Sequence, residues 1–147
     1  MSFTPYLNFD GDCAEAFAFY AELFGGAIVY QATFGEMESM EGMPPLQEEA
    51  RNRIMHAQLQ LGGGRLMGSD AFPGGDEACG GPYQRPQGMW VSVEAEDAAQ
   101  GKRFFDGLAQ GGEIHMPYAE TFWSPGFGMV RDRFGILWMV NVPGQDG

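Results

Sequence analysis

Basic residues are scarce in this chain of 147 residues. Only 8 Lys and Arg stand against 20 Asp and Glu, which gives a formal net charge of −12 at pH 7. A surface of this sign repels phosphate groups, so nucleic acid and anionic membranes are excluded as expected partners. The charge favours a small-molecule ligand that is cationic or neutral.

Cysteines and long apolar runs are also scarce. Two cysteines, Cys13 and Cys79, do not form a disulfide framework. The sequence has neither an 18-residue apolar run nor a basic start typical of a secretory signal. We therefore expect a cytoplasmic protein with reduced thiols and no membrane partner.

The apolar content is sufficient for one packed domain spanning 1–147. Hydrophobic residues make up 44% of the chain and aromatic residues 14%, so wholesale disorder is excluded. The length fits a single domain rather than two independent cores.

The first half of the chain predicts a strand, a helix and three further strands. Asp12 and Glu15 have the spacing of a capping box, and Gly25 provides a left-handed stop for the helix. Three glycines from Gly62 turn one alternating segment into the next, which indicates a hairpin. The expected elements are a strand at 5–9, a helix from 12 to 25, a strand at 27–34, a solvated loop at 35–52 and a hairpin of 53–61 with 65–69.

The same order of elements returns in the second half. Asp97, with Gln100 three residues later, again predicts a helix start, and it follows Asp12 by 85 residues. The expected elements are a strand at 89–93, a helix from 97 to 111, a strand at 114–116 and a hairpin of 127–131 with 136–142. We therefore predict an α+β fold of two tandem βαβββ modules, with module one at about 1–70, a linker at about 71–87 and module two at about 88–147.

The C-terminal segments resemble a known family. The motifs are Glu120–Trp123, the turn Asp132–Gly135 and the strand Trp138–Val142, and they resemble the PhnB-like branch of the vicinal oxygen chelate superfamily. Phe19-Tyr20 followed by Leu23-Phe24-Gly25 is similar to the first helix of that superfamily, which includes glyoxalase I, bleomycin-resistance proteins and dioxygenases. The resemblance implies a curved mixed sheet around a cleft and a homodimer.

Superfamily enzymes hold one divalent metal with His or Glu from the first and last strands of each module. The corresponding positions in this chain are Pro5 or Tyr6, Gly68, Gly88 or Met89, and Met139. None of these is a usual ligand for such an ion. We therefore expect no metal and no other cofactor.

Seven residues are candidates for contact with a small molecule. They are His56, Thr121, Trp123, Phe127, Met129, Trp138 and Asn141. Aromatic and Met side chains around a few polar groups are typical of ligand pockets. The competing interpretation is that His56 is a strand histidine satisfied by a neighbour, and that the aromatic residues are core.

Cys13 has two opposed interpretations. Its place at a helix N-terminus predicts a lowered thiol pKa. Its apolar helix position instead favours a buried structural residue. The structural interpretation is the one that we adopt.

Three functions remain open from the sequence, and the third is a purely structural or partner-binding protein without a cavity large enough for a ligand. The first is binding or sequestering of a small molecule without the standard metal site. The alternative is a metal-dependent lyase, isomerase or dioxygenase with a rearranged site that includes His56. A methyltransferase label carried by some PhnB-like proteins has no support, because no G-x-G-x-x-G motif here follows a strand and opens a helix.

Overall fold

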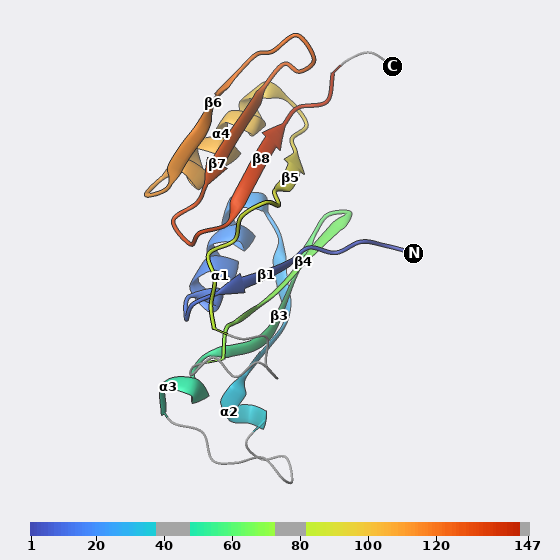
Figure 1. The fold of residues 1–147 in the computed structure, drawn as a ribbon. Coiled ribbons are helices and arrows are strands. Elements are labelled where there is room, and N and C mark those ends of the chain that lie inside the picture. Colours follow the sequence, from blue (N-terminus) through green and yellow to red (C-terminus); the bar gives the residue numbers. More distant parts are fainter. Residues whose placement is uncertain (38–47, 73–81, 145–147) are drawn as a thin grey trace. The chain divides into compact units, whose positions relative to one another are not determined.

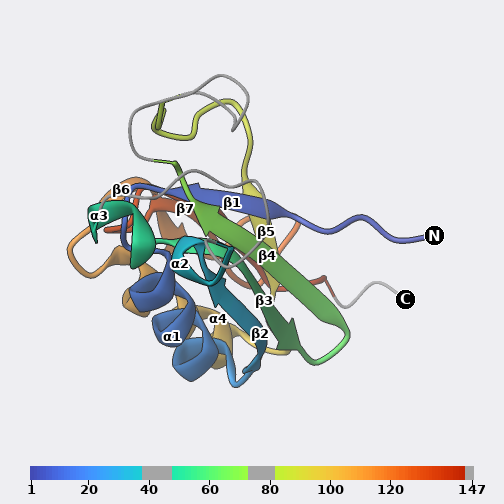
Figure 2. The same ribbon diagram turned by 90° about the horizontal axis from the view of Figure 1, so that it is seen from below.

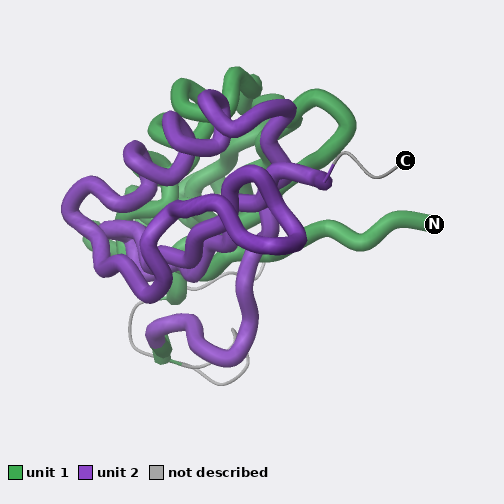
Figure 3. The backbone as a smooth tube through the Cα atoms, turned by 90° about the horizontal axis from the view of Figure 1, so that it is seen from above, with its two compact units in different colours: residues 1–84 green, residues 85–147 purple. Residues whose placement is uncertain are grey.

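The computed structural model describes residues 1–37, 48–72 and 82–144 (Figure 1). The chain divides into two compact units, Met1–Gln84 and Arg85–Gly147, which Figure 3 colours separately. The elements of the first unit are β1 (Tyr6–Phe9), α1 (Cys13–Phe24), β2 (Ala27–Thr33), α2 (Phe34–Met37), α3 (Glu48–Arg51), β3 (Ile54–Leu61) and β4 (Gly64–Asp70). Those of the second unit are β5 (Val91–Glu94), α4 (Ala98–Ala109), β6 (Glu113–Ala119), β7 (Phe127–Arg131) and β8 (Leu137–Asn141).

Each unit contains one four-stranded mixed sheet with the same topology. The strand orders are β1-β4-β3-β2 and β5-β8-β7-β6, and the first strand of each unit runs parallel to the last. The remaining neighbours are antiparallel. This arrangement confirms the predicted α+β fold of two tandem βαβββ modules.

One helix lies against one face of each sheet. In the first unit α1 lies beside the sheet (Figure 2). Its Phe17 ring meets the Phe9 ring of β1 edge-on at 6.0 Å. In the second unit the Phe105 ring of α4 lies beside Gly128 on β7. Because strand side chains alternate between faces, these contacts identify which residues point the other way. We call the face of each sheet opposite α1 or α4 its distal face.

The two long helices begin differently, although the sequence predicts a capping box for both. Asp97 accepts a hydrogen bond from the Gln100 backbone at 2.8 Å, and Gln100 accepts one from the Glu96 backbone, as predicted for α4. At α1 the Asp12 side chain makes no capping hydrogen bond, so that part of the prediction is wrong. Gly25 ends α1 in the left-handed conformation, with φ of 75°, as expected.

The predicted loop at 35–52 also needs correction. The structure places the one-turn helices α2 and α3 at its two ends, whereas 38–47 lie outside the described residues. Acidic residues in the first turn favour both short helices, because they complement the helix dipole. No helix in the described ranges is long and apolar enough to cross a membrane.

Candidate functional site

His56 lies at the centre of a polar and aromatic cluster on the distal face of the first sheet. The Tyr6 hydroxyl lies 3.2 Å from His56 Nδ1, and the Gln58 amide nitrogen lies 3.1 Å from His56 Nε2. The rings of Tyr6 and Tyr30 lie 5.7 and 5.9 Å from the imidazole, measured between centroids. We call these four residues, Tyr6, Tyr30, His56 and Gln58, the His56 cluster.

Strand register explains why these residues meet. Tyr6 pairs with Met67 of β4, Met67 pairs with Gln58 of β3, and Gln58 pairs with Tyr30 of β2. Three members of the cluster therefore lie in one row across the sheet. His56 lies two residues before Gln58 and shares its face. Tyr6 and Tyr30 remain 53% and 49% exposed, so the cluster combines a fixed polar centre with accessible rings.

Sequence reasoning identified only His56 as a candidate ligand-contacting residue of this cluster. The alternation along 54–61 places Gln58 on the same face as His56, so this partner could have been found from the sequence. The sequence indicates Tyr6 only as a position that corresponds to a metal ligand in superfamily enzymes. Tyr30 offered no signal, because its contact with His56 depends on the pairing of β2 with β3.

Four of the other candidates gather in the second unit. Phe127 pairs with Asn141, and Met129 pairs with Met139, all on the distal face of the second sheet. The Trp123 ring contacts the Phe127 ring edge-on at 5.4 Å. The Asn141 Oδ1 is buried and has no hydrogen-bond partner in the described part of the chain, which leaves an acceptor available in this region.

The remaining two candidates are engaged within the protein. Trp138 is only 1% exposed and donates its indole N–H to Asp132 Oδ2 at 2.9 Å. Thr121 closes a tight turn, in which its hydroxyl accepts a hydrogen bond from the Ser124 backbone at 3.1 Å. Trp138 therefore fits the core interpretation, and the Thr121 hydroxyl has a partner within its own turn. We leave both residues out of the site that we propose.

The register also tests whether the superfamily's metal could be held. A Cβ added at Gly68 would lie 2.9 Å from the Phe17 ring, so this position faces α1 rather than the distal face. Gly88 and Met89 precede β5, and the β5 residue that pairs with Met139 is Ser92. Within residues 1–37, 48–72 and 82–144, no three His, Cys, Asp or Glu side chains are grouped so that they could share a metal ion. The described residues do not fit the standard divalent ion.

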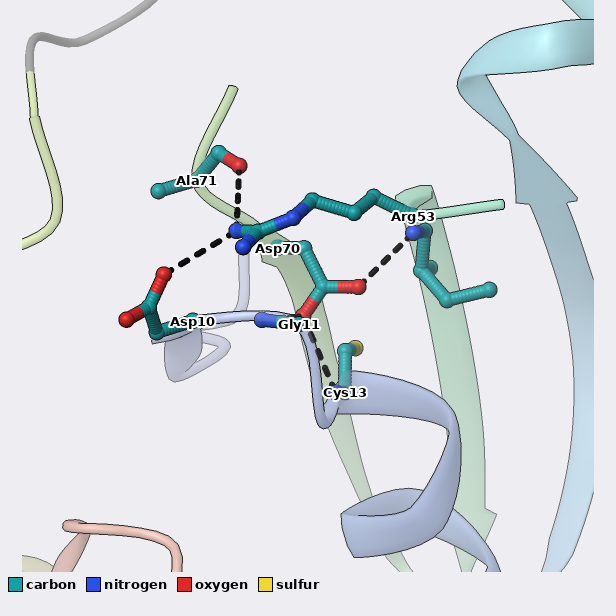
Figure 4. A network of polar contacts seen from close by, with 7 residues as sticks. Asp10, Gly11, Cys13, Arg53, Asp70 and Ala71 are labelled. Carbon is teal, nitrogen blue, oxygen red and sulfur yellow. Dashed lines mark hydrogen bonds and ion pairs between the residues drawn. The ribbon is translucent and has the colours of Figure 1, made fainter. Parts of the chain in front are cut away.

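A second polar network binds the start of α1 to the sheet (Figure 4). Asp70 is 3% exposed, and its carboxylate accepts hydrogen bonds from the backbones of Gly11, Cys13 and Ile54 at 2.8, 3.0 and 2.8 Å. Arg53 beside it forms an ion pair with Asp10 at 3.0 Å. Asp70 thus performs the capping role that the sequence assigns to Asp12, and the network is structural.

Burial, followed by the nearby carboxylates of Asp70 and Asp12, raises the pKa of the Cys13 thiol far above its ordinary value. The lowering expected at a helix N-terminus is therefore wrong, since desolvation of the thiolate outweighs the helix dipole. The adopted interpretation of Cys13 as a buried residue is correct, because its exposed fraction is 0%.

The raised pKa predicts an inert thiol. In a Cys79→Ser variant, we expect Cys13 to remain unlabelled by a thiol-specific disulfide reagent at pH 8 in the folded protein. The same thiol reacts fully once denaturant unfolds the chain, because it then regains an ordinary pKa. Colorimetric thiol counting checks this, and rapid stoichiometric labelling of the folded variant would contradict it.

Comparison with known proteins places this geometry in a family. Residues 3–140 match the model of the Glyoxalase/Bleomycin resistance protein/Dioxygenase superfamily. Protein YjdN of Escherichia coli is 37% identical over 150 residues, covering 99% of this chain and 97% of that protein.

Two solved structures share both fold and sequence with the chain. Protein PA1353 from Pseudomonas aeruginosa has a TM-score of 0.82 and 37% identity, with 97% of this chain and 98% of that one covered. A Bacillus cereus protein described as a putative 3-demethylubiquinone-9 3-methyltransferase, PhnB protein, has a TM-score of 0.74 and 26% identity, with 97% and 99% covered. The second structure supports the PhnB-like resemblance of the C-terminal motifs.

Proposed function

Because the chain belongs to the glyoxalase/bleomycin resistance protein/dioxygenase superfamily, we propose that it binds a small organic molecule without the standard metal site. The His56 cluster is the observation that carries this proposal. Both ring nitrogens of His56 have side-chain partners, and two half-exposed tyrosines flank the ring. An oriented polar group beside aromatic side chains is typical of the residues that line small-molecule sites.

The distal face of the second sheet supports the same proposal. Trp123, which is 47% exposed, provides apolar surface beside Phe127 and Met129. Asn141 provides an acceptor without a partner in the described part of the chain. We propose that the second unit, taken by itself, contacts a small molecule through these four residues. The net charge of −12 disfavours an anionic compound, so the ligand is neutral or cationic.

We propose no cofactor for this activity. The positions that carry ligands in superfamily enzymes are filled here by Tyr6, Gly68, Met139 and residues near the start of β5, which lack the usual metal-binding groups. The metal-dependent enzyme with a rearranged site at His56 is the outcome that would replace this proposal.

The first test compares His56→Ala with His115→Ala. His115 is the only other histidine, and its ring also contacts an aromatic ring, that of Trp90 at 5.4 Å. Phenol and indole, titrated separately, should produce saturable NMR shifts at the rings of Tyr6 and Tyr30. We expect His56→Ala to weaken this binding by about 0.5–1.5 kcal/mol, the worth of one hydrogen bond, because the imidazole that orders the Tyr6 and Gln58 side chains is gone.

The His115→Ala variant should bind both probes as the wild type does. Equal losses in the two variants would contradict a role specific to His56. Native mass spectrometry of freshly purified protein provides the second measurement. About one equivalent of metal per chain, released by His56→Ala, would move the protein into the metal-dependent class.

We also propose that the chain forms a homodimer. β2 and β6 are edge strands, and they expose Ile28, Val29, Ile114 and Met116. Pairing with a second copy would cover such edges. Light scattering at micromolar concentration should give twice the 16.1 kDa chain mass, whereas a mass near that of one chain would refute the dimer.

A further inference from the structure

Two hydrogen bonds connect Gln58, His56 and Tyr6 across the distal face of the first sheet, and both donate in the direction from Gln58 toward Tyr6. The Gln58 amide nitrogen faces His56 Nε2, and the Tyr6 hydroxyl faces His56 Nδ1. An amide nitrogen can only donate, so Nε2 of the neutral ring must accept. The ring hydrogen then lies on Nδ1, which donates to the Tyr6 oxygen.

This direction leaves the hydrogen of the Tyr6 hydroxyl unused by His56. No described residue accepts it, and Tyr6 is 53% exposed. We propose that Tyr6 is the ligand-contacting donor of the site, and that Gln58 and His56 are positioning residues that keep its hydroxyl hydrogen directed outward. The inference rests on the proposed function and specifies how its ligand is recognised.

The same geometry defines the class of ligand. A donor at Tyr6 requires an acceptor oxygen or nitrogen on the bound molecule. The exposed rings of Tyr6 and Tyr30 favour a flat partner that can stack or pack edge-on. With the imidazole neutral, the cluster carries no formal charge to recognise an ion. The ligand class is therefore an uncharged aromatic or conjugated carbonyl compound.

The ring tautomer provides a test that needs no ligand. In a His115→Gln variant His56 is the only histidine left, so long-range ¹H–¹⁵N correlation spectra report a single imidazole. The spectra are recorded at a pH at which they show this imidazole to be neutral. We expect the hydrogen on Nδ1. Gln58→Glu keeps the side-chain shape but replaces the donor by an acceptor, so we expect the hydrogen to move to Nε2. If the hydrogen lies on Nε2 in the wild type, or does not move in Gln58→Glu, the hydrogen-bond direction from Gln58 through His56 to Tyr6 is wrong.

Two probes of similar shape test the ligand class. Acetophenone carries a carbonyl oxygen, and α-methylstyrene has a methylene group in its place. We expect the His56 cluster to bind acetophenone about threefold to tenfold more tightly, the worth of one hydrogen bond. Tyr6→Phe should remove this preference while keeping the ring. Gln58→Glu should remove it as well, because the Tyr6 hydroxyl then donates to Nδ1.

The outcomes separate this inference from the proposed function. Binding of both probes without preference overturns the donor role of Tyr6, and leaves small-molecule binding at the cluster intact. A preference for acetophenone that persists in Tyr6→Phe also overturns the donor role of Tyr6 and leaves small-molecule binding intact. Failure of both probes to bind overturns the ligand class, whereas the comparison of His56→Ala with His115→Ala decides the proposed function separately.

Discussion

Replacing Asp70 by alanine should lower the free energy of unfolding by about 3–5 kcal/mol. The carboxylate is 3% exposed and accepts hydrogen bonds from the backbones of Gly11, Cys13 and Ile54. Its removal leaves three backbone donors without their charged acceptor, at a place where water has little access. Equilibrium denaturation in urea measures the loss.

The matched control is Asp10→Ala in the same network (Figure 4). Asp10 is 60% exposed and contributes only an ion pair with Arg53, so its loss should cost less than about 1 kcal/mol. The loss in Asp70→Asn should lie between these two values. The amide keeps one acceptor oxygen, but its NH₂ group, which is a donor, then faces a backbone N–H. If Asp70→Ala lowers the free energy of unfolding no more than Asp10→Ala does, then the buried hydrogen bonds of Asp70 do not stabilise the fold as expected.

The same substitution bears on the candidate site. Asp70 holds the backbone of Ile54 at the start of β3, two residues before His56. The conformation of this strand start fixes where the imidazole lies relative to Tyr6. In Asp70→Ala we therefore expect weaker probe binding at the His56 cluster, although Asp70 touches none of its four residues through a described hydrogen bond.

The sequence predicts well those features that depend on neighbouring residues. The cap of α4 needs only Asp97 and Gln100, and the stop of α1 needs only Gly25. The hairpin of β7 and β8 follows from the turn residues Asp132–Gly135 between two apolar segments. Such signals repeat in both halves, which is why the tandem modules could be predicted before the structure.

Features that join distant residues were missed. Asp70 replaces Asp12 as the cap of α1 from 57 positions away along the chain, and no local pattern indicates it. Tyr6 reaches His56 across 50 positions, through a register that only the folded sheet defines. The sequence leaves Trp138 open between ligand contact and core, because β8 is almost continuously apolar and its alternation does not show which face is covered.

Asp132 is a buried carboxylate in the turn between β7 and β8, and Asp132→Asn should lower the free energy of unfolding by about 2–3 kcal/mol. Oδ1 accepts hydrogen bonds from the backbones of Phe134 and Ile136, each at 2.9 Å, and Oδ2 accepts the Trp138 indole N–H. Asparagine retains one acceptor oxygen, so its amide nitrogen must face either the indole N–H or the two backbone donors.

The indole of Trp138 provides a local readout beside the unfolding curve. In Asp132→Asn its N–H signal should move and exchange faster with solvent, because the charged acceptor that holds it is gone. Asp106→Asn is the matched control, since it removes an exposed carboxylate whose ion pair with Lys102 is worth less than about 1 kcal/mol. If both variants unfold at the same denaturant concentration and the Trp138 signal is unchanged, then Trp138 is held by packing alone. Its absence from the proposed ligand site would in that case rest on burial and not on the bond to Asp132.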